Sequence, residues 1–204
     1  MDSFASIPMK DPKGYLTREQ VEKLIDAAEN LRDKLILLLM YRCGRRVSEV
    51  LLLTKDDILW EDKKIIFTIL KRKRPVKELK PVDDYTLKLL DLYVNHNIRM
   101  RGIRKKPGNR LFPVTRQYVF KLVRKLGEKT GITRVGNKKL HPHHLRHSFA
   151  VHAVRTEVKT AEDLRKLQMY MGHANISTTS YYLQFSPDEL RSLVDGMWKR
   201  REKQ

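Results

Sequence analysis

The sequence predicts an α+β fold that is mainly α-helical and contains one small antiparallel sheet or hairpin. Apolar residues recur at helical spacing over most of the chain, whereas two short segments between residues 64 and 82 have the character of strands. No glycine- or serine-rich linker and no repeat divides the 204 residues. We therefore expect a single domain, and this length is sufficient for a substantial core.

The first elements follow from local signals. Residues 1–14 are expected to form an extended lead-in, because prolines and a glycine there discourage regular structure. Thr17 and Gln20 form a capping box at the start of a helix whose apolar residues share one face. The next stretch, "LRDKLILLLMYRCG", is apolar nearly all round, which predicts a central buried helix that ends at Gly44.

The middle of the chain carries the predicted strands. They are "KIIFTIL" (64–70) and "VKELKPV" (76–82), and the strongly basic turn "KRKRP" lies between them. Asp83 or Asp84 then caps a helix that carries Leu87 on its apolar face.

The C-terminal half is predicted to be helical. After a basic loop at 97–110, four stretches combine helical spacing with start or stop signals. They cover residues 115–129, 143–157, 161–171 and 187–199. Gly131 ends the first of them, and Pro142 lies in the first turn of the second.

The charge balance points to a polyanionic partner. Lysine and arginine number 43 against 24 aspartates and glutamates, which gives a net charge of +19. Such a surplus is self-repelling unless a polyanion neutralises it, so we expect double-stranded DNA or another nucleic acid as the partner. The alternative is a lysine-rich surface that is merely solvated.

Cysteine content and hydropathy narrow the class further. Cys43 is the only cysteine, which excludes an intrachain disulfide and a cysteine-based zinc site. The N-terminus has no apolar signal core, and no apolar run approaches the length of a membrane span. We expect a soluble, intracellular (cytoplasmic) chain that associates with DNA.

The segment "HPHHLRHSFA" (141–150) contains four of the seven histidines. On a helix, His143, Arg146 and His147 share one face. His143 and His147 have the i, i+4 spacing of a zinc pair, but Arg146 would put a permanent cation beside the metal. The pattern favours a site for phosphate, with no metal, although partly buried histidines bonded to the backbone remain the alternative.

Several motifs occur in a diagnostic order. "CGRRVSEVLLL" (43–53) precedes the basic hairpin, "HPHHLRH" follows it, and "MGHANISTTSYY" (171–182) comes last. An arginine, a basic hairpin, His-x-x-Arg, Gly-His and a tyrosine in this order resemble the catalytic domain of the tyrosine recombinases, the phage-integrase family. The resemblance extends from about residue 15 to 185 and implies that family's fold.

The resemblance assigns candidate catalytic residues position by position. The family's Gly-x-Arg-x-Ser-Glu setting matches Arg46 as the first catalytic arginine and Glu49 as an acidic residue that orients the site. The alternative for Glu49 is a surface helix cap. The Pro-His-x-Leu-Arg-His pattern matches His143 and Arg146 as a site pair, with His147 as a structural neighbour.

Two further motifs supply the remaining candidates. The Gly-His pattern matches His173, and the family's nucleophile nine residues later falls on Tyr182. Tyr181 is the alternative nucleophile, and otherwise a packing aromatic. The family's hairpin lysine, counted back from the proline near the end of the second strand, is Lys73, with Lys71 as the alternative.

Together these matches imply a site-specific recombinase or integrase. It would cleave and rejoin DNA strands through a 3′-phosphotyrosyl intermediate, with no cofactor, neither metal nor ATP. Cations near the candidate site are expected to contact DNA. These are Arg45, Lys71, Arg72, Arg74 and Lys77.

The resemblance also bears on domains and partners. It implies that residues 15–204 form the catalytic domain, without the family's N-terminal DNA-clamp domain, and that a homo-oligomer, a tetramer on DNA, carries out strand exchange. The helix at 187–199 either docks on a neighbouring protomer or packs on its own core. Three other functions remain open: DNA relaxation as by a type IB topoisomerase, a catalytically inactive DNA-binding module, and a zinc-dependent hydrolase.

Overall fold

The computed structural model describes residues 14–70, 75–100, 109–158 and 160–172. The predictions of a lead-in, of the hairpin turn and of a helix at 187–199 concern residues 1–13, 71–74 and 173–204, which lie outside these ranges.

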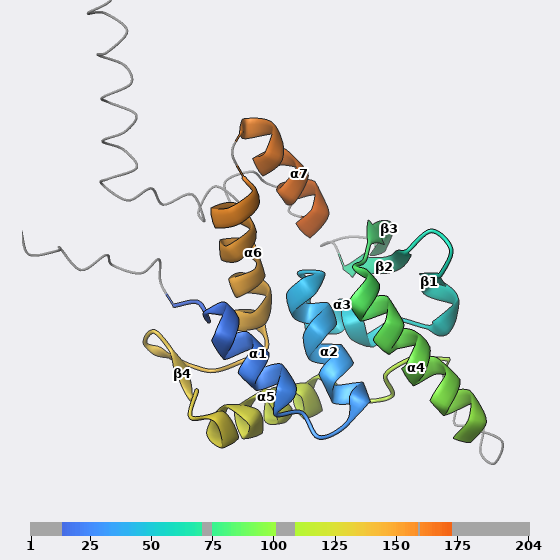
Figure 1. The fold of residues 1–204 in the computed structure, drawn as a ribbon, viewed down its shortest axis with the longest axis horizontal. Helices are drawn as coiled ribbons and strands as arrows, with labels where there is room; N and C mark the ends of the chain where they lie inside the picture. The colour runs from blue at the N-terminus through green and yellow to red at the C-terminus, as the bar shows by residue number, and fades with distance from the viewer. Residues whose placement is uncertain (1–13, 71–74, 101–108, 159, 173–204) are drawn as a thin grey trace, which may run out of the picture.

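Figure 1 shows the order of the elements. The helices are α1 (Arg18–Asp26), α2 (Leu31–Arg42), α3 (Val47–Leu51), α4 (Asp84–Met100), α5 (Arg116–Thr130), α6 (His143–Glu157) and α7 (Ala161–Met171). The strands are β1 (Ile58–Leu59), β2 (Lys64–Leu70), β3 (Pro75–Pro81), β4 (Arg134–Val135) and β5 (Lys138–Lys139), and a short 3₁₀ helix, η1 (Lys55–Asp57), precedes β1.

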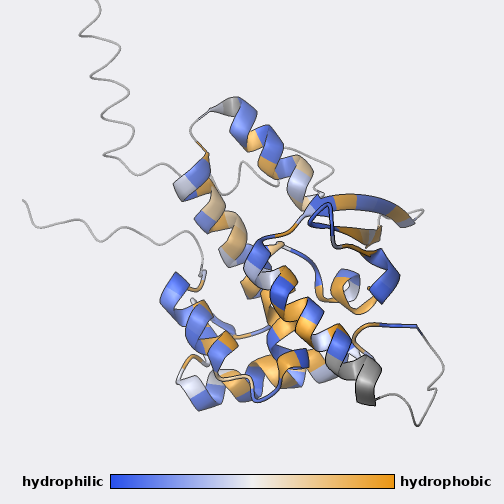
Figure 2. Ribbon diagram, turned by 45° about the vertical axis from the view of Figure 1, so that its right-hand side comes forward, coloured by the Kyte–Doolittle hydropathy of each residue, from blue (hydrophilic) through white to orange (hydrophobic). Residues whose placement is uncertain are grey.

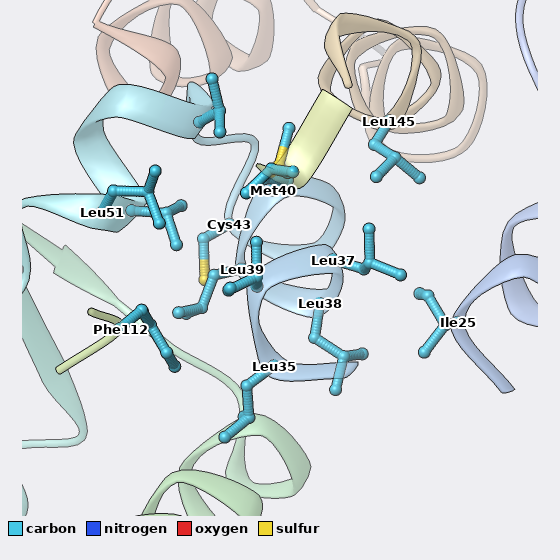
Figure 3. Close-up of a cluster of buried hydrophobic side chains, with 14 of the residues drawn as sticks. Ile25, Leu35, Leu37, Leu38, Leu39, Met40, Cys43, Leu51, Phe112 and Leu145 are labelled. Atoms are coloured by element: carbon cyan, nitrogen blue, oxygen red, sulfur yellow. The ribbon is translucent and has the colours of Figure 1, made fainter. Parts of the chain in front are cut away.

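Helix α2 is the centre of the core. The Asn30 side chain accepts a hydrogen bond from the Asp33 amide at 2.9 Å and begins the helix. Six successive residues, 35–40, are buried, because α1, α3, α4 and α6 all pack against α2. Figure 3 shows α2 side chains meeting Ile25 and Leu145 from α1 and α6. Full burial of each such leucine stabilises the fold by about 1.5–3 kcal/mol.

The three-stranded sheet has the order β1-β2-β3 and is antiparallel throughout. One face of β2 presents Ile65, Phe67 and Ile69 to the core, and all three are at most 1% exposed. The register pairs Ile65 with Lys80 and Phe67 with Glu78, so two charged residues of β3 share the core-facing side. This register brings β3 beside the end of α7.

Helices α6 and α7 form a second layer with a smaller core. Buried Ala150, Val154, Leu164, Leu167 and Met171 pack together between them. In Figure 2 the centre of the ribbon is mostly hydrophobic, whereas α7 is largely hydrophilic along its outer side. The end of α7 points back toward α3 and the sheet, and this arrangement produces the site.

Most predicted elements are confirmed. The capping box of Thr17 and Gln20 is present, and Gly131 ends α5 in the left-handed region at φ +77°. The structure differs in several places: residues 97–100 belong to α4 rather than to a loop, β3 is shifted by one residue from the expected 76–82, and η1, strand β1 and the β4–β5 hairpin were not expected. Strands β1, β4 and β5 have only two residues each, too short for a visible alternation. No helix in the described ranges is both long and apolar enough to cross a bilayer.

Candidate active site

A tight turn after α2 builds the first part of the site. Gly44 has φ +59°, and a Cβ there would lie 2.5 Å from the Phe149 ring, so only glycine fits. The turn directs the two following arginines differently. Arg46 is the N-cap residue of α3 and its side chain is 36% exposed, whereas Arg45 is 0% exposed.

Glu49 joins the two candidate catalytic arginines. Its Oε1 lies 2.7 Å from Nη1 of Arg46, and its Oε2 accepts the Arg46 amide at 3.0 Å. The same Oε2 lies 3.9 Å from Nη1 of Arg146. The Glu49 side chain is 0% exposed and caps α3 through the Arg46 amide, so it is a buried cap rather than a surface one, and its role in orienting the site stays a prediction.

Arg146 links three segments that are distant in the sequence. Its Nη1 donates to the Gly44 carbonyl at 2.5 Å, and its Nη2 donates to the Met171 carbonyl at 2.8 Å. Only 7% of the side chain is exposed. These bonds hold the guanidinium beside Glu49 and tie α6 to the end of α7, directly before Gly172 and His173.

His143 is the first residue of α6 and lies at the surface beside these arginines. Burial of part of the ring, followed by the positive charges of Arg146, Arg46 and Arg116, lowers the pKa of His143 below 6.5, while Glu49 opposes the shift. The imidazole is therefore mostly neutral at pH 7 and can accept a proton.

The other histidines of the cluster have structural positions. His144 is 5% exposed, and its Nδ1 accepts the His141 amide at 3.1 Å. The rings of His141 and His144 lie 3.8 Å apart. Desolvation, followed by the charges of neighbouring histidines and Lys138, lowers the pKa of His144 to about 4. His147 is half-buried on the same helix.

No metal-ligating group of three or more histidine, cysteine, aspartate or glutamate side chains occurs in the part of the chain that the structure describes.

One predicted DNA contact is wrong. Arg45 is completely buried: its Nε donates to the Cys43 carbonyl at 2.7 Å, its Nη2 donates to the Tyr170 carbonyl, and its guanidinium packs on the rings of Phe67 and Tyr170. The turn at Gly44 directs this side chain inward, so it cannot reach a DNA backbone. Lys77, by contrast, is 72% exposed on β3 and lies 3.9 Å from Asp57.

Several predicted residues fall outside the described ranges. They are Lys71, Arg72, Lys73, Arg74, His173, Tyr181 and Tyr182. The structure therefore brings Arg46, Glu49, His143 and Arg146 together, and the described chain ends one residue before His173.

Two basic residues near the site were not predicted. Lys80 is 9% exposed and donates to the Met169 carbonyl at 2.7 Å. The local signal for this position was that Glu78 and Lys80 are two residues apart on β3 and so share one face, which lies opposite the buried residues of β2. Arg116 contributes positive charge at His143 and, with Gln117, Phe120 and Lys121, lines a surface hollow of about 610 Å³.

Comparison with known proteins agrees with this geometry. The family model described as the phage integrase family matches residues 14–189, and the chain belongs to that family. The tyrosine recombinase XerA of Pyrococcus horikoshii is 35% identical over 195 residues, which cover 93% of this chain and 62% of XerA. The chain thus spans less than two thirds of that relative's length.

Solved structures share the fold. The catalytic domain of bacteriophage HP1 integrase superposes with a TM-score of 0.61 at 24% identity, covering 89% of this chain and 94% of that domain. The Tn1549 transposon integrase, solved in complex with a circular intermediate DNA, gives a TM-score of 0.65 at 21% identity, covering 93% of this chain and 67% of the integrase. The predicted fold class, a mainly helical recombinase catalytic domain with a small antiparallel sheet, is confirmed.

Proposed function

We propose that the chain carries the catalytic centre of a site-specific DNA recombinase that cuts and rejoins strands through a 3′-phosphotyrosyl intermediate. The observation that carries this proposal is the buried Glu49 carboxylate between the guanidinium groups of Arg46 and Arg146. The name of XerA and the family membership support the same reaction.

The arginine pair suits a phosphodiester undergoing substitution. The transition state concentrates negative charge on the non-bridging oxygens, and preorganised guanidinium groups stabilise that charge. Arg146 is held by two carbonyls at 2.5 and 2.8 Å, so little reorganisation is needed when the phosphate enters. Arg46 is the more exposed of the two and would meet the phosphate from the solvent side.

Proton transfers complete the proposed reaction. The Tyr182 hydroxyl, with an ordinary pKa of about 10, loses its proton to neutral His143 as its oxygen bonds to phosphorus. The 5′-oxygen leaves and takes a proton from Lys73, while His173 adds a hydrogen bond to the phosphate. A 5′-hydroxyl from another strand reverses the step, so the bond energy is conserved without metal or ATP.

Double-stranded DNA is the proposed partner. The charge of +19 supports it, and so does the exposed Lys77, which follows the basic residues Lys71, Arg72 and Arg74 in the sequence. Each active site cuts one strand, so exchange between two duplexes needs four copies, and we propose a tetramer on DNA. The protein would act in the compartment that holds the cell's DNA.

Covalent trapping tests the reaction. The probe is a pool of nicked duplexes with random sequence on both sides of the nick, so that the short cleaved fragment diffuses away and the adduct persists. We expect a covalent protein–DNA band with the natural chain and with Tyr181→Phe, and none with Tyr182→Phe. A band that survives in Tyr182→Phe but is lost in Tyr181→Phe would assign the nucleophile to Tyr181.

Replacement of Arg146 by lysine tests the role of the guanidinium. The charge remains, but the fork that can hold two phosphate oxygens is lost, so cleavage should fall by about 100-fold while DNA binding changes little. Arg165→Lys, an exposed change on α7, is the matched control. Equal losses of cleavage and binding in Arg146→Lys would indicate a role in binding alone.

A further inference from the structure

Three cations converge on the end of α7. Nζ of Lys80 donates to the Met169 carbonyl at 2.7 Å, Nη2 of Arg45 donates to the Tyr170 carbonyl, and Nη2 of Arg146 donates to the Met171 carbonyl at 2.8 Å. The donors come from three elements, namely β3, the turn after α2, and α6. Three successive carbonyls are thus held from three directions.

The end of a helix is a favourable place for such donors. The last carbonyls of an α-helix have no partner within the helix and carry the negative end of its dipole. Gly172, at φ +66°, caps α7 and donates its amide to the Met169 carbonyl at 3.2 Å. The three cations donate charge-assisted hydrogen bonds to the carbonyls of this last turn, and such bonds are stronger than neutral ones.

The burial of these cations indicates that they hold a particular position. Arg45 is 0% exposed and Lys80 is 9% exposed, although burying a cation is unfavourable unless it is paired. Glu78 lies 3.0 Å from Lys80, and the Arg45 guanidinium lies 5.3 Å from the Tyr170 ring centre. Apolar side chains would fill the same space at lower cost, whereas only directed donors fix the register of the helix end.

We propose that Arg45 and Lys80 are positioning residues, which together with Arg146 fix the last turn of α7, after which His173 and Tyr182 follow in the sequence. Arg146 belongs both to the three cations that hold the end of α7 and to the candidate catalytic residues, because it donates to the Met171 carbonyl and lies beside Glu49. The helix end is therefore fastened directly to the site that receives the phosphate. This inference rests on the proposed function, since it concerns delivery of the tyrosine to that site.

Lys80→Met is the informative variant because methionine preserves the unbranched apolar stem and removes only the donor. Lys80→Arg restores a cation, and Lys166→Met, which removes an exposed lysine from α7 itself, is the control. The first measurement needs no DNA: hydrogen exchange of the peptide around residues 165–175 in the full chain. We expect exchange about tenfold faster in Lys80→Met and unchanged in Lys166→Met, because a charge-assisted hydrogen bond is lost. Equal exchange rates in the two variants would overturn the proposal.

The second measurement follows cleavage of the nicked duplex that traps the covalent adduct. The scissile phosphate carries either the natural bridging 5′-oxygen or a 5′-sulfur. A thiolate leaves without a proton donor, so sulfur restores variants that lack the general acid but not those with a misplaced nucleophile. We expect cleavage by Lys80→Met to fall about 100-fold with both substrates, and Lys80→Arg to recover most of it. Natural rates in Lys80→Met, or restoration by sulfur, would contradict a positioning role. Failure of the natural chain to form any adduct would refute the proposed function, and the exchange measurement would still test the helix anchor.

Discussion

The apolar core around α2 and the polar layer at the end of α7 are built on opposite principles. In the core, six successive buried residues of α2 meet side chains of the surrounding helices, and many neighbours share each contact. In the polar layer, Glu49, Arg146, Arg45 and Lys80 each make a few directed bonds to groups from distant segments. The core can tolerate the loss of part of a side chain, whereas the polar layer leaves a buried charge unpaired when one member is removed.

Removal of Glu49 should have the largest effect. Glu49→Ala takes away the 0% exposed carboxylate that pairs with Arg46 and lies near Arg146, so the two guanidinium groups repel each other. The free energy of unfolding should fall by about 4 kcal/mol, measured by urea denaturation at pH 7. Glu22→Ala, an exposed change on α1, should stay within about 0.5 kcal/mol of the natural chain. A similar small loss in Glu49→Ala would show that the polar layer is not coupled to stability.

Leu37→Ala probes the core by the same measurement. Leu37 is 1% exposed on α2, so the truncation should cost about 3 kcal/mol, while Leu92→Ala, at a 51% exposed position, should cost almost nothing. The core and the polar layer should differ in their effect on activity. At a low temperature where it is folded, Leu37→Ala should cleave the nicked duplex at nearly the natural rate, whereas Glu49→Ala should not. A parallel loss of cleavage in Leu37→Ala would remove that distinction.

The two layers also differ in how far the sequence predicts them. The α2 helix and its neighbours follow from local apolar periodicity, capping residues and the stop at Gly44, all of which lie within a few positions of the element they define. The misses are elements with little local signal. In β4 and β5, two residues on each side of a turn at Gly136 offer no alternation to recognise.

The polar layer is only partly predictable because its contacts join residues far apart in the chain. Arg46, Glu49, His143 and Arg146 were found through motif spacing, and the structure brings them together. Arg45 was misassigned because sequence adjacency to Arg46 says nothing about a side chain that a positive-φ glycine turns inward. Lys80 was missed because its role depends on the register of β2 with β3 and on the end of α7, 89 positions away.

Acid should lower the free energy of unfolding through the pair of His141 and His144, which lies beside the polar layer. The pKa of His144 is about 4 in the folded chain against an ordinary value of 6.5, so the unfolded chain binds more protons between these values. The stability that neutral His144 contributes is therefore fully present above pH 6.5 and falls as the pH drops from 6.5 to about 4, by about 3 kcal/mol for this residue.

His144→Asn provides the control for this pH dependence. Asparagine offers an acceptor near Nδ1, which could keep the 3.1 Å bond from the His141 amide, but it does not titrate. Urea denaturation at pH 4.5 and 7.5 should show a smaller difference in the variant. The pKa values of His141, His143 and His152 are lowered in the same direction, so a smaller slope should remain. An identical slope in both chains would exclude His144 as its source.

Tyr118→Phe should have the smallest effect, because it removes one partner from a buried carboxylate that has several. The Tyr118 hydroxyl donates to Oδ2 of Asp33 at 2.7 Å and accepts from Nη2 of Arg32 at 2.6 Å. Asp33 is 3% exposed but keeps Nε of Arg32 and the Asn30 amide group, both at 2.9 Å. The free energy of unfolding should therefore fall by only about 1 kcal/mol, with Tyr85→Phe at a 47% exposed position as the unchanged control. A loss as large as that of Glu49→Ala would mean that the number of remaining partners does not determine how well a buried carboxylate tolerates the loss of one. The contrast between the core and the polar layer would then have to rest on burial alone.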